Sequence, residues 1–364
     1  MLEQARSGGT IDLAAGDPSF PTPPHIASAA AEAAALGATH YTHGRGDIDL
    51  RAAIARKLET VNGISAEPES EIVVTAGALN ALAAAFFALV GPGDEVLVPD
   101  PGFANYQAQV SLAGGAAVPV PLADDWSVDV DAVAQRLGPR TRVLVLNSPA
   151  NPTGAVTDRT RLEALASILA DTDITVVSDE AYERLVYAPA RHVSVASLPA
   201  LSARTVSIFS FSKTYAMTGW RLGYLVAPRE IADGVTKVQE HLIGCASSIS
   251  QAAGLAALRG PVDPIVAMVG EYERRRGEVV TAFAGLPSVD LVEPAGAFYA
   301  FARVPSSTGD AAVEIASATG VLTVPGEAFG ARGHGHIRVS YAGPPAALSE
   351  GLHRLRQHLA GGFD

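Results

Sequence analysis

One lysine stands in a stretch of small and hydroxylated residues that could bind an aldehyde and a phosphate. Lys213 lies in the stretch Ser210–Gly223, directly after the apolar run Val206–Phe209, and Arg221 follows eight positions later. A lysine amine attacks aldehydes when its surroundings lower its pKa, and the product is a Schiff base. Hydroxyls and a guanidinium are the donors that a phosphate needs. The stretch predicts a site for pyridoxal 5'-phosphate (PLP), an aldehyde that carries a phosphate. An ordinary loop with a surface lysine and arginine is the alternative.

A carboxylate follows another apolar run, which is typical of a buried strand. Residues Ile174–Ser178 lead directly into Asp179, and Tyr182 stands three residues further along. Ligands of open α/β sheets bind at the carboxyl ends of strands. A carboxylate there can hold a protonated ring nitrogen, because each charge stabilises the other. The short Asp-x-x-Tyr spacing also occurs by chance, so its place between Asn151 and Lys213 is what favours this interpretation.

A glycine separates a predicted strand from a predicted helix. The strand covers Glu71–Ala76, and Gly77, Ala78 and Leu79 open an alanine-rich helix. A helix N-terminus has free N–H groups and the positive end of the helix dipole, which together favour an anion. This pattern alone is weak evidence, but the PLP site predicted at Lys213 independently requires a phosphate site nearby.

Two further predicted strands lead to residues that could bind a flat cofactor ring. Asp94–Val98 runs towards Phe103 and Tyr106, and an aromatic ring stacked on a cofactor adds about 0.5–1.5 kcal/mol beyond its burial. Packing in the core is the alternative for both rings. Arg142–Leu146 leads to Asn151, whose side-chain amide can donate a hydrogen bond to a phenolic oxygen. A plain proline-rich loop is the alternative there.

These motifs, in this order, resemble the class I/II aminotransferases, which are fold-type I PLP enzymes. The stretch Ser210–Gly223 is similar to the family's lysine signature, and Asn147–Gly154 to its Asn-Pro-x-Asn-Pro-Thr-Gly segment, although Ser148 and Ala150 flank the first proline here. The resemblance implies that Lys213 carries PLP as a Schiff base, that Ser210, Ser212, Arg221, Gly77, Ala78 and Leu79 surround its phosphate, that Phe103 covers its ring, that Asn151 and Tyr182 donate to its phenolic oxygen, and that Asp179 pairs with its ring nitrogen.

The resemblance also implies where the substrate and a second subunit are bound. Gly16 opens a Gly-x-Pro-x-Phe-x-Thr-Pro loop and is expected to offer its N–H to the substrate carboxylate, with a simple N-terminal arm as the alternative. Arg338 lies within an apolar strand, where an unpaired guanidinium is costly. The family's arginine at this place clamps the α-carboxylate, and Asn151 is expected to contact the substrate as well. Tyr41 matches a tyrosine that reaches the neighbour's PLP phosphate, so a homodimer with shared sites is expected. A tyrosine packed at the start of a helix is the alternative.

The implied fold is α/β and places these residues on a large domain with a mostly parallel, seven-stranded sheet. We expect this PLP-binding domain to cover residues 40–272. A small α/β domain, with an N-terminal arm, is expected from residues 1–39 and 273–364. Helices are predicted over His25–Leu36, Asp49–Asn62 and Glu271–Gly277, and an antiparallel strand over Gly223–Ala227. A strand is also predicted in the segment Pro294–Phe301.

Composition excludes several classes of protein and partner. The 364 residues are 48% hydrophobic, which suits an enzyme with a sizeable core. The net charge of −12 disfavours binding to nucleic acid or to an anionic membrane surface. A single cysteine excludes an internal disulfide and a multi-cysteine metal site, and no metal is expected. The run Ala81–Val90 is too short to cross a bilayer, and no signal pattern precedes it, so a cytoplasmic location is expected.

We therefore expect an aminotransferase that moves an amino group between an L-amino acid and a 2-oxo acid. A lyase or synthase on the same scaffold is the alternative, because the same residues would produce the same carbanion. A PLP-binding regulator without turnover is a third possibility, which the acidic charge disfavours. The segment His241–Gln251 contains neither Arg nor Lys. We therefore predict that aspartate, which carries a second carboxylate, is a poorer donor than neutral or aromatic amino acids, unless Arg45 reaches the neighbouring site.

Overall fold

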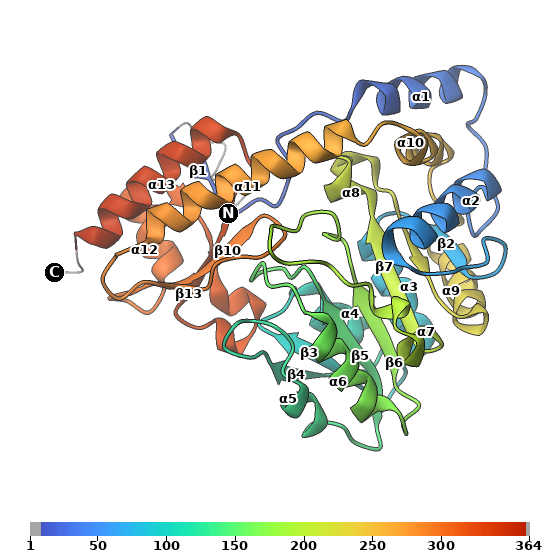
Figure 1. Ribbon diagram of the computed structural model, residues 1–364, viewed down its shortest axis with the longest axis horizontal. Coiled ribbons are helices and arrows are strands. Elements are labelled where there is room, and N and C mark those ends of the chain that lie inside the picture. The colour runs from blue at the N-terminus through green and yellow to red at the C-terminus, as the bar shows by residue number, and fades with distance from the viewer. Residues whose placement is uncertain (1–8, 362–364) are drawn as a thin grey trace.

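The computed structural model describes residues 9–361 and contains a large sheet and a smaller sheet, both flanked by helices (Figure 1). The large sheet has seven strands in the order β2-β8-β7-β6-β5-β3-β4. Its strands are β2 (Ile72–Thr75), β3 (Glu95–Asp100), β4 (Ala116–Pro121), β5 (Thr141–Asn147), β6 (Thr175–Asp179), β7 (Thr205–Ser210) and β8 (Gly223–Val226). Only β8 runs antiparallel to its neighbours, β2 and β7, whereas the other pairs are parallel. The predicted α/β fold with a mostly parallel seven-stranded sheet is confirmed.

Both faces of this sheet are covered by helices and carry buried apolar side chains. On β5, Val143 and Val145 pack with α3 (Ala78–Leu89), α4 (Asn105–Leu112) and α9 (Arg229–Leu242). Leu144 and Leu146 point the other way and pack with α5 (Val130–Ala134) and α6 (Arg159–Leu169). Successive side chains of a strand point to opposite faces, so a continuous apolar run produces a strand buried on both sides.

The smaller sheet is antiparallel and has the strand order β12-β13-β10-β9. Its strands are β9 (Asp290–Leu291), β10 (Tyr299–Arg303), β12 (Val324–Pro325) and β13 (His336–Ser340). Three helices accompany it, α11 (Asp263–Phe283), α12 (Ala311–Thr319) and α13 (Pro345–Ala360). The N-terminal β1 (Ile11–Asp12) pairs in parallel with β11 (Val321–Leu322), so a segment from early in the chain joins the part that contains this sheet.

A single helix connects the two parts of the molecule. The predicted helix Glu271–Gly277 is a segment of α11, which has 21 residues and passes residues 272 and 273 without a break. In Figure 1, α11 extends from the side of α10 (Ser248–Arg259) to the side of α12 and α13. The predicted boundary therefore falls inside a continuous helix, and the division into two domains stays a prediction.

Other predicted elements differ from the structure at their ends. The helix expected over Asp49–Asn62 is α2 (Ile48–Lys57), followed by one π-helical turn over Leu58–Asn62. The first helix, α1, covers Pro24–Ala35. The strand expected within Pro294–Phe301 begins only at Tyr299. Two short helices, α7 (Pro199–Ser202) and α8 (Phe211–Thr214), flank β7.

The hydropathy of the helices adds one observation about membranes. Within residues 9–361, no single helix is both long and apolar enough to cross a bilayer, and only α10 and α11, which meet at a bend of 84°, reach the required length and hydropathy as a pair. Across the same residues, no three side chains of His, Cys, Asp or Glu form a group that could hold a metal ion.

Candidate active site

A cavity of about 310 Å³ lies at the carboxyl ends of the central strands, between the large sheet and the N-terminal arm. A volume of this size suits a small cofactor or substrate. It is lined by most of the residues that the sequence singled out, namely Gly16, Ala78, Leu79, Phe103, Asn151, Asp179, Tyr182, Ser210, Ser212, Lys213, Arg221 and Arg338. The wall also includes Tyr106, Asn147 and Tyr299. Tyr41 is not part of the wall.

Lys213 is the amine of this cavity. It lies on the single turn of α8 directly after β7, and its Nζ donates a hydrogen bond of 2.6 Å to the carbonyl of Gly16. Burial lowers the pKa of Lys213 to about 8; nearby Asp17 opposes that change, and the positive charges of Arg221 and Arg338 add to it. An amine with this pKa loses its proton far more readily than a surface lysine, which both Schiff-base formation and base catalysis require.

The N-terminus of α3 and Arg221 form a concave, electropositive end of the cavity. Gly77 precedes α3 with φ of +82°, and α3 has no side-chain cap. A Cβ atom at Gly77 would lie only 2.7 Å from Nη2 of Arg221, so a side chain there would strike the guanidinium. Ser210 caps α8 by accepting a 3.1 Å bond from the N–H of Ser212. The uncapped N–H groups, the guanidinium and the hydroxyl suit a phosphate.

Asp179 is a buried carboxylate at the end of β6. Its Oδ2 accepts a 2.7 Å bond from the hydroxyl of Tyr106, and its Oδ1 accepts from the N–H of Ala181 at 3.2 Å. Burial raises the pKa of Asp179; the Tyr106 and Ala181 bonds oppose this, and the adjacent Glu180 charge adds to it. No cation pairs with it among the described residues, so the carboxylate suits a cationic ligand that enters the cavity.

Tyr106 is the functional residue whose part the sequence did not reveal. We expected it only as a second aromatic wall. Its hydroxyl instead supports Asp179, and its ring lies edge-on to Phe103 at 5.6 Å between centroids. Burial raises the pKa of Tyr106 well above its ordinary value, and the contact with Asp179 raises it further. The spacing Phe-x-x-Tyr at the start of α4 was the available signal, because it puts both rings near one strand end.

Arg338 and Asn151 both line the cavity and are hydrogen-bonded to each other. The Nη1 of Arg338 donates a 2.8 Å bond to Oδ1 of Asn151, and its Nη2 donates to the carbonyl of Ala14 at 2.6 Å. The guanidinium lies 4.3 Å from the ring centroid of Tyr299. Its Nε is buried without a partner. Because Oδ1 of Asn151 accepts from Arg338, its Nδ2 remains as the donor that the predicted role requires.

Tyr299 lies so close to Gly16 that a side chain at position 16 would displace it. A Cβ atom on Gly16 would lie 2.0 Å from the hydroxyl oxygen of Tyr299. The same hydroxyl lies 3.0 Å from that of Tyr182. Burial raises the pKa of Tyr182 well above its ordinary value, and the contact with Tyr299 adds to this, so Tyr182 keeps its proton as a donor.

Two residues that the sequence linked to a neighbouring subunit lie outside the cavity. Tyr41 is 92% exposed, so the alternative that it packs at the start of a helix is wrong within this chain. Arg45 is buried, forms an ion pair with Asp233 and donates a 2.7 Å bond to the carbonyl of Ser70. Arg45 is therefore held within its own subunit.

The donor set of the cavity fits PLP. An amine whose pKa is lowered, a concave anion site and a carboxylate without a cation correspond to the aldehyde, the phosphate and the protonated ring nitrogen. The fit rests on Lys213, on the close approach of Gly77 to Arg221 and on buried Asp179.

Comparison with known proteins identifies the family. The family described as "Aminotransferase class I and II" matches residues 9–355. An aspartate aminotransferase of Pyrococcus abyssi is 40% identical over 96% of this chain and 91% of its own length. The aromatic-amino-acid aminotransferase 2 of Thermococcus litoralis is 38% identical over 96% of this chain and 92% of its own length.

Solved structures agree with these sequence matches. The crystal structure of an aromatic aminotransferase from Pyrococcus horikoshii superimposes with a TM-score of 0.94 at 39% identity, covering 99% of this chain and 98% of that one. An aspartate aminotransferase from Thermus thermophilus with maleate gives a TM-score of 0.91 at 37% identity, covering 98% of this chain and 94% of that one. Because the family match covers nearly the whole of this chain, the chain belongs to the class I and II aminotransferases, which are PLP-dependent enzymes of fold-type I.

Proposed function

We propose that this aminotransferase uses Lys213 both to bind PLP and to move the substrate proton. The observation that carries the proposal is the amine of Lys213, which lies in the cavity with a pKa lowered to about 8 by burial. Bound PLP supplies an electron sink that acidifies the α-carbon of an attached amino acid. Lys213 would then remove the α-proton of the amino acid with its Nζ. A base with a pKa near the working pH does this well.

The remaining residues hold the reactants in place. Arg338 binds the α-carboxylate of the amino acid, since among the three cations that line the cavity Lys213 is the base and Arg221 serves the phosphate. Its contact with Asn151 keeps the guanidinium oriented. Asp179, held by Tyr106, keeps a proton on the ring nitrogen, and the end formed by α3, Ser210 and Arg221 retains the phosphate. Phe103 and Tyr182 complete the walls around the ring.

The preferred amino donor is neutral or aromatic rather than aspartate. The described residues that line the cavity include three cations, Lys213, Arg221 and Arg338, and each has a role above. None remains within this chain for a second carboxylate, and Arg45 is occupied by Asp233. A lost charge-assisted hydrogen bond costs about 1.5–3 kcal/mol. The relatives carry both aspartate and aromatic names, so their names do not decide the donor.

A homodimer is part of the proposal. Large apolar side chains are exposed at Leu36, Tyr41, Leu242 and Ile243, and the last two lie at the end of α9. The ring of Tyr41 lies close to this segment: a Cβ atom on Gly244 would be 3.9 Å from it. A second subunit would cover these side chains, and Tyr41 would reach that subunit's PLP phosphate. The division into a large domain over 40–272 and a small domain from both ends, and a cytoplasmic location, belong to the same proposal.

Turnover with a panel of donors tests this function. We expect purified enzyme with PLP to convert neutral and aromatic amino acids with a 2-oxo acid acceptor, and to have a lower kcat/KM for aspartate. Each donor should yield one 2-oxo acid for each new amino acid. Release of ammonia without consumption of the acceptor would instead identify the lyase. A preference for aspartate that disappears in Arg45→Ala would show that Arg45 leaves Asp233 to serve the neighbour.

A further inference from the structure

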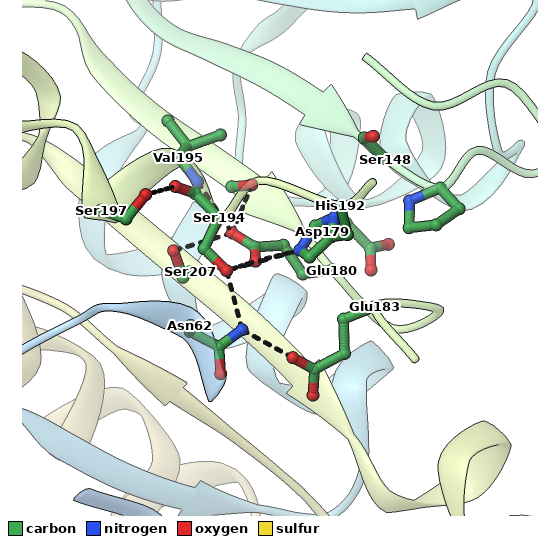
Figure 2. A network of polar contacts seen from close by, with 12 residues as sticks. Asn62, Ser148, Asp179, Glu180, Glu183, His192, Ser194, Val195, Ser197 and Ser207 are labelled. Atoms are coloured by element: carbon green, nitrogen blue, oxygen red, sulfur yellow. Dashed lines mark hydrogen bonds and ion pairs between the residues drawn. The ribbon is translucent and has the colours of Figure 1, made fainter. Parts of the chain in front are cut away.

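A second buried carboxylate lies directly behind Asp179. Glu180 is 1% exposed and is absent from the wall of the cavity, and its carboxylate points away from that of Asp179 (Figure 2). This follows from the alternation of side chains along a strand, which sends neighbours 179 and 180 to opposite sides. None of the motifs that define the cavity requires an acid at this position.

Four side chains from three segments hold the Glu180 carboxylate. Its Oε1 accepts from Ser178 of β6 at 2.9 Å and from Ser207 of β7 at 3.1 Å. Its Oε2 accepts from Ser194 at 2.6 Å and contacts Nε2 of His192 at 2.9 Å. Figure 2 shows His192, Ser194 and Ser207 converging on Glu180. The carboxylate therefore ties both strands to the 192–195 loop.

Glu180 is ionised in this environment. Burial raises its pKa, but the hydrogen bond and the positive charge of His192, together with the bonds from Ser194 and Ser178, outweigh burial and leave the pKa below its ordinary value. The Nδ1 of His192 is buried without a partner. The ring therefore contacts this cluster through Nε2.

The nearby cation is already neutralised by another acid. Lys57 forms a buried ion pair with Glu183, and Nδ2 of Asn62 donates to Glu183 at 2.7 Å and to Ser194 at 2.8 Å. The ionisable groups that face Glu180 from the packed segments are Asp179, His192, Glu183, Lys57 and Tyr224. Among these described groups, His192 is the one that contacts the Glu180 carboxylate and can carry a positive charge.

We propose that Glu180 is a positioning residue for Asp179: it fixes the strand end that carries Asp179 and places a carboxylate charge behind it. This charge favours a positive ring nitrogen on the cavity side, so it strengthens the retention of PLP without touching it. The inference rests on the proposed role of Asp179. It assigns part of the electrostatics of the site to a cluster on the far side of the sheet.

Binding of PLP to the apoenzyme tests the proposal without any turnover. Glu180→Gln keeps the shape and removes the charge, and we expect its dissociation constant for PLP, from an absorbance titration, to rise about tenfold. The pH at which the absorbance of bound PLP changes should fall in the same variant. Ser207→Ala removes one bond to Glu180 but keeps the charge, and it should bind PLP like the wild type.

Two further variants keep the test decisive. His192→Lys puts a cation against Glu180 while the carboxylate remains, so it should weaken PLP binding as Glu180→Gln does, even if Glu180→Gln does not fold. Asp179→Asn is the reference for the proposed function. If Asp179→Asn binds PLP normally, the role of Asp179 is wrong. Two outcomes would show that the charge of Glu180 has no such role. In the first, Asp179→Asn binds PLP more weakly, but folded Glu180→Gln and His192→Lys bind PLP like the wild type. In the second, Ser207→Ala binds PLP as weakly as Glu180→Gln and His192→Lys.

Discussion

Replacing Lys213 by methionine should stabilise the apoenzyme at neutral pH, although it abolishes the amine. An ordinary lysine has a pKa of 10.5, and burial lowers that of Lys213 to about 8. At about 1.36 kcal/mol for each tenfold change, keeping Lys213 protonated in the folded state at pH 7 costs roughly 3 kcal/mol. Methionine removes this cost and is close to lysine in length.

Part of the gain is offset by a lost hydrogen bond. The Nζ of Lys213 donates to the carbonyl of Gly16 at 2.6 Å, and a bond from a charged donor contributes about 1.5–3 kcal/mol. We therefore expect Lys213→Met to raise the free energy of unfolding of the apoenzyme by roughly 1 kcal/mol at pH 7.

The pH dependence gives the sign of the effect. The folded-state pKa lies below the unfolded one, so between about pH 8 and pH 10.5 the unfolded chain binds more protons than the folded chain. The wild-type apoenzyme should therefore gain stability relative to Lys213→Met as the pH rises through this window. Titrations of other groups are common to both proteins and cancel in the difference.

Urea unfolding of both apoenzymes at pH 7 and at pH 10 measures this difference. Lys237 lies exposed on α9, so Lys237→Met is the matched control and should show no such pH-dependent difference. A Lys213→Met apoenzyme that is less stable than the wild type at pH 7, or a stability difference that is the same at both pH values, would refute the reasoning.

Substitutions at three further residues probe the site. Asp179→Ala should lose most turnover while Asp179→Glu keeps some, because only a carboxylate can hold the ring proton; a near wild-type kcat for Asp179→Ala would contradict this. Tyr106→Phe removes the 2.7 Å bond to Asp179, a charge-assisted bond that contributes about 1.5–3 kcal/mol, so kcat/KM should fall about tenfold or more with the fold intact by circular dichroism. Arg338→Lys loses the fork that reaches Asn151 and Ala14, and its KM for the amino donor should rise roughly tenfold to a hundredfold, whereas an unchanged KM would place the α-carboxylate elsewhere.

The sequence by itself determined the elements of the sheet and the residues that follow them. Apolar, β-branched runs are buried strands in the structure, and the side chains at their carboxyl ends, such as Asn151, Asp179 and Lys213, meet in one cavity. This works because parallel strands end at the same edge of a sheet, so that position along the chain predicts position in space. The resemblance to a known family supplied the order in which those strand ends are used.

The tertiary structure alone decided which side chains touch. Tyr106 and Asp179 are 73 positions apart, and only the adjacent packing of α4 and the strand ends brings the hydroxyl to the carboxylate. Likewise, Arg45 finds Asp233 on α9, which removes it as a free cation, and Glu180 finds its partners on β7 and a distant loop. The extent of α11 was also hidden, because its apolar residues pack against both parts of the molecule and its sequence pattern changes along the way. Hydrogen bonds and ion pairs between distant segments depend on atomic distances and burial, which hydrophobic periodicity does not specify.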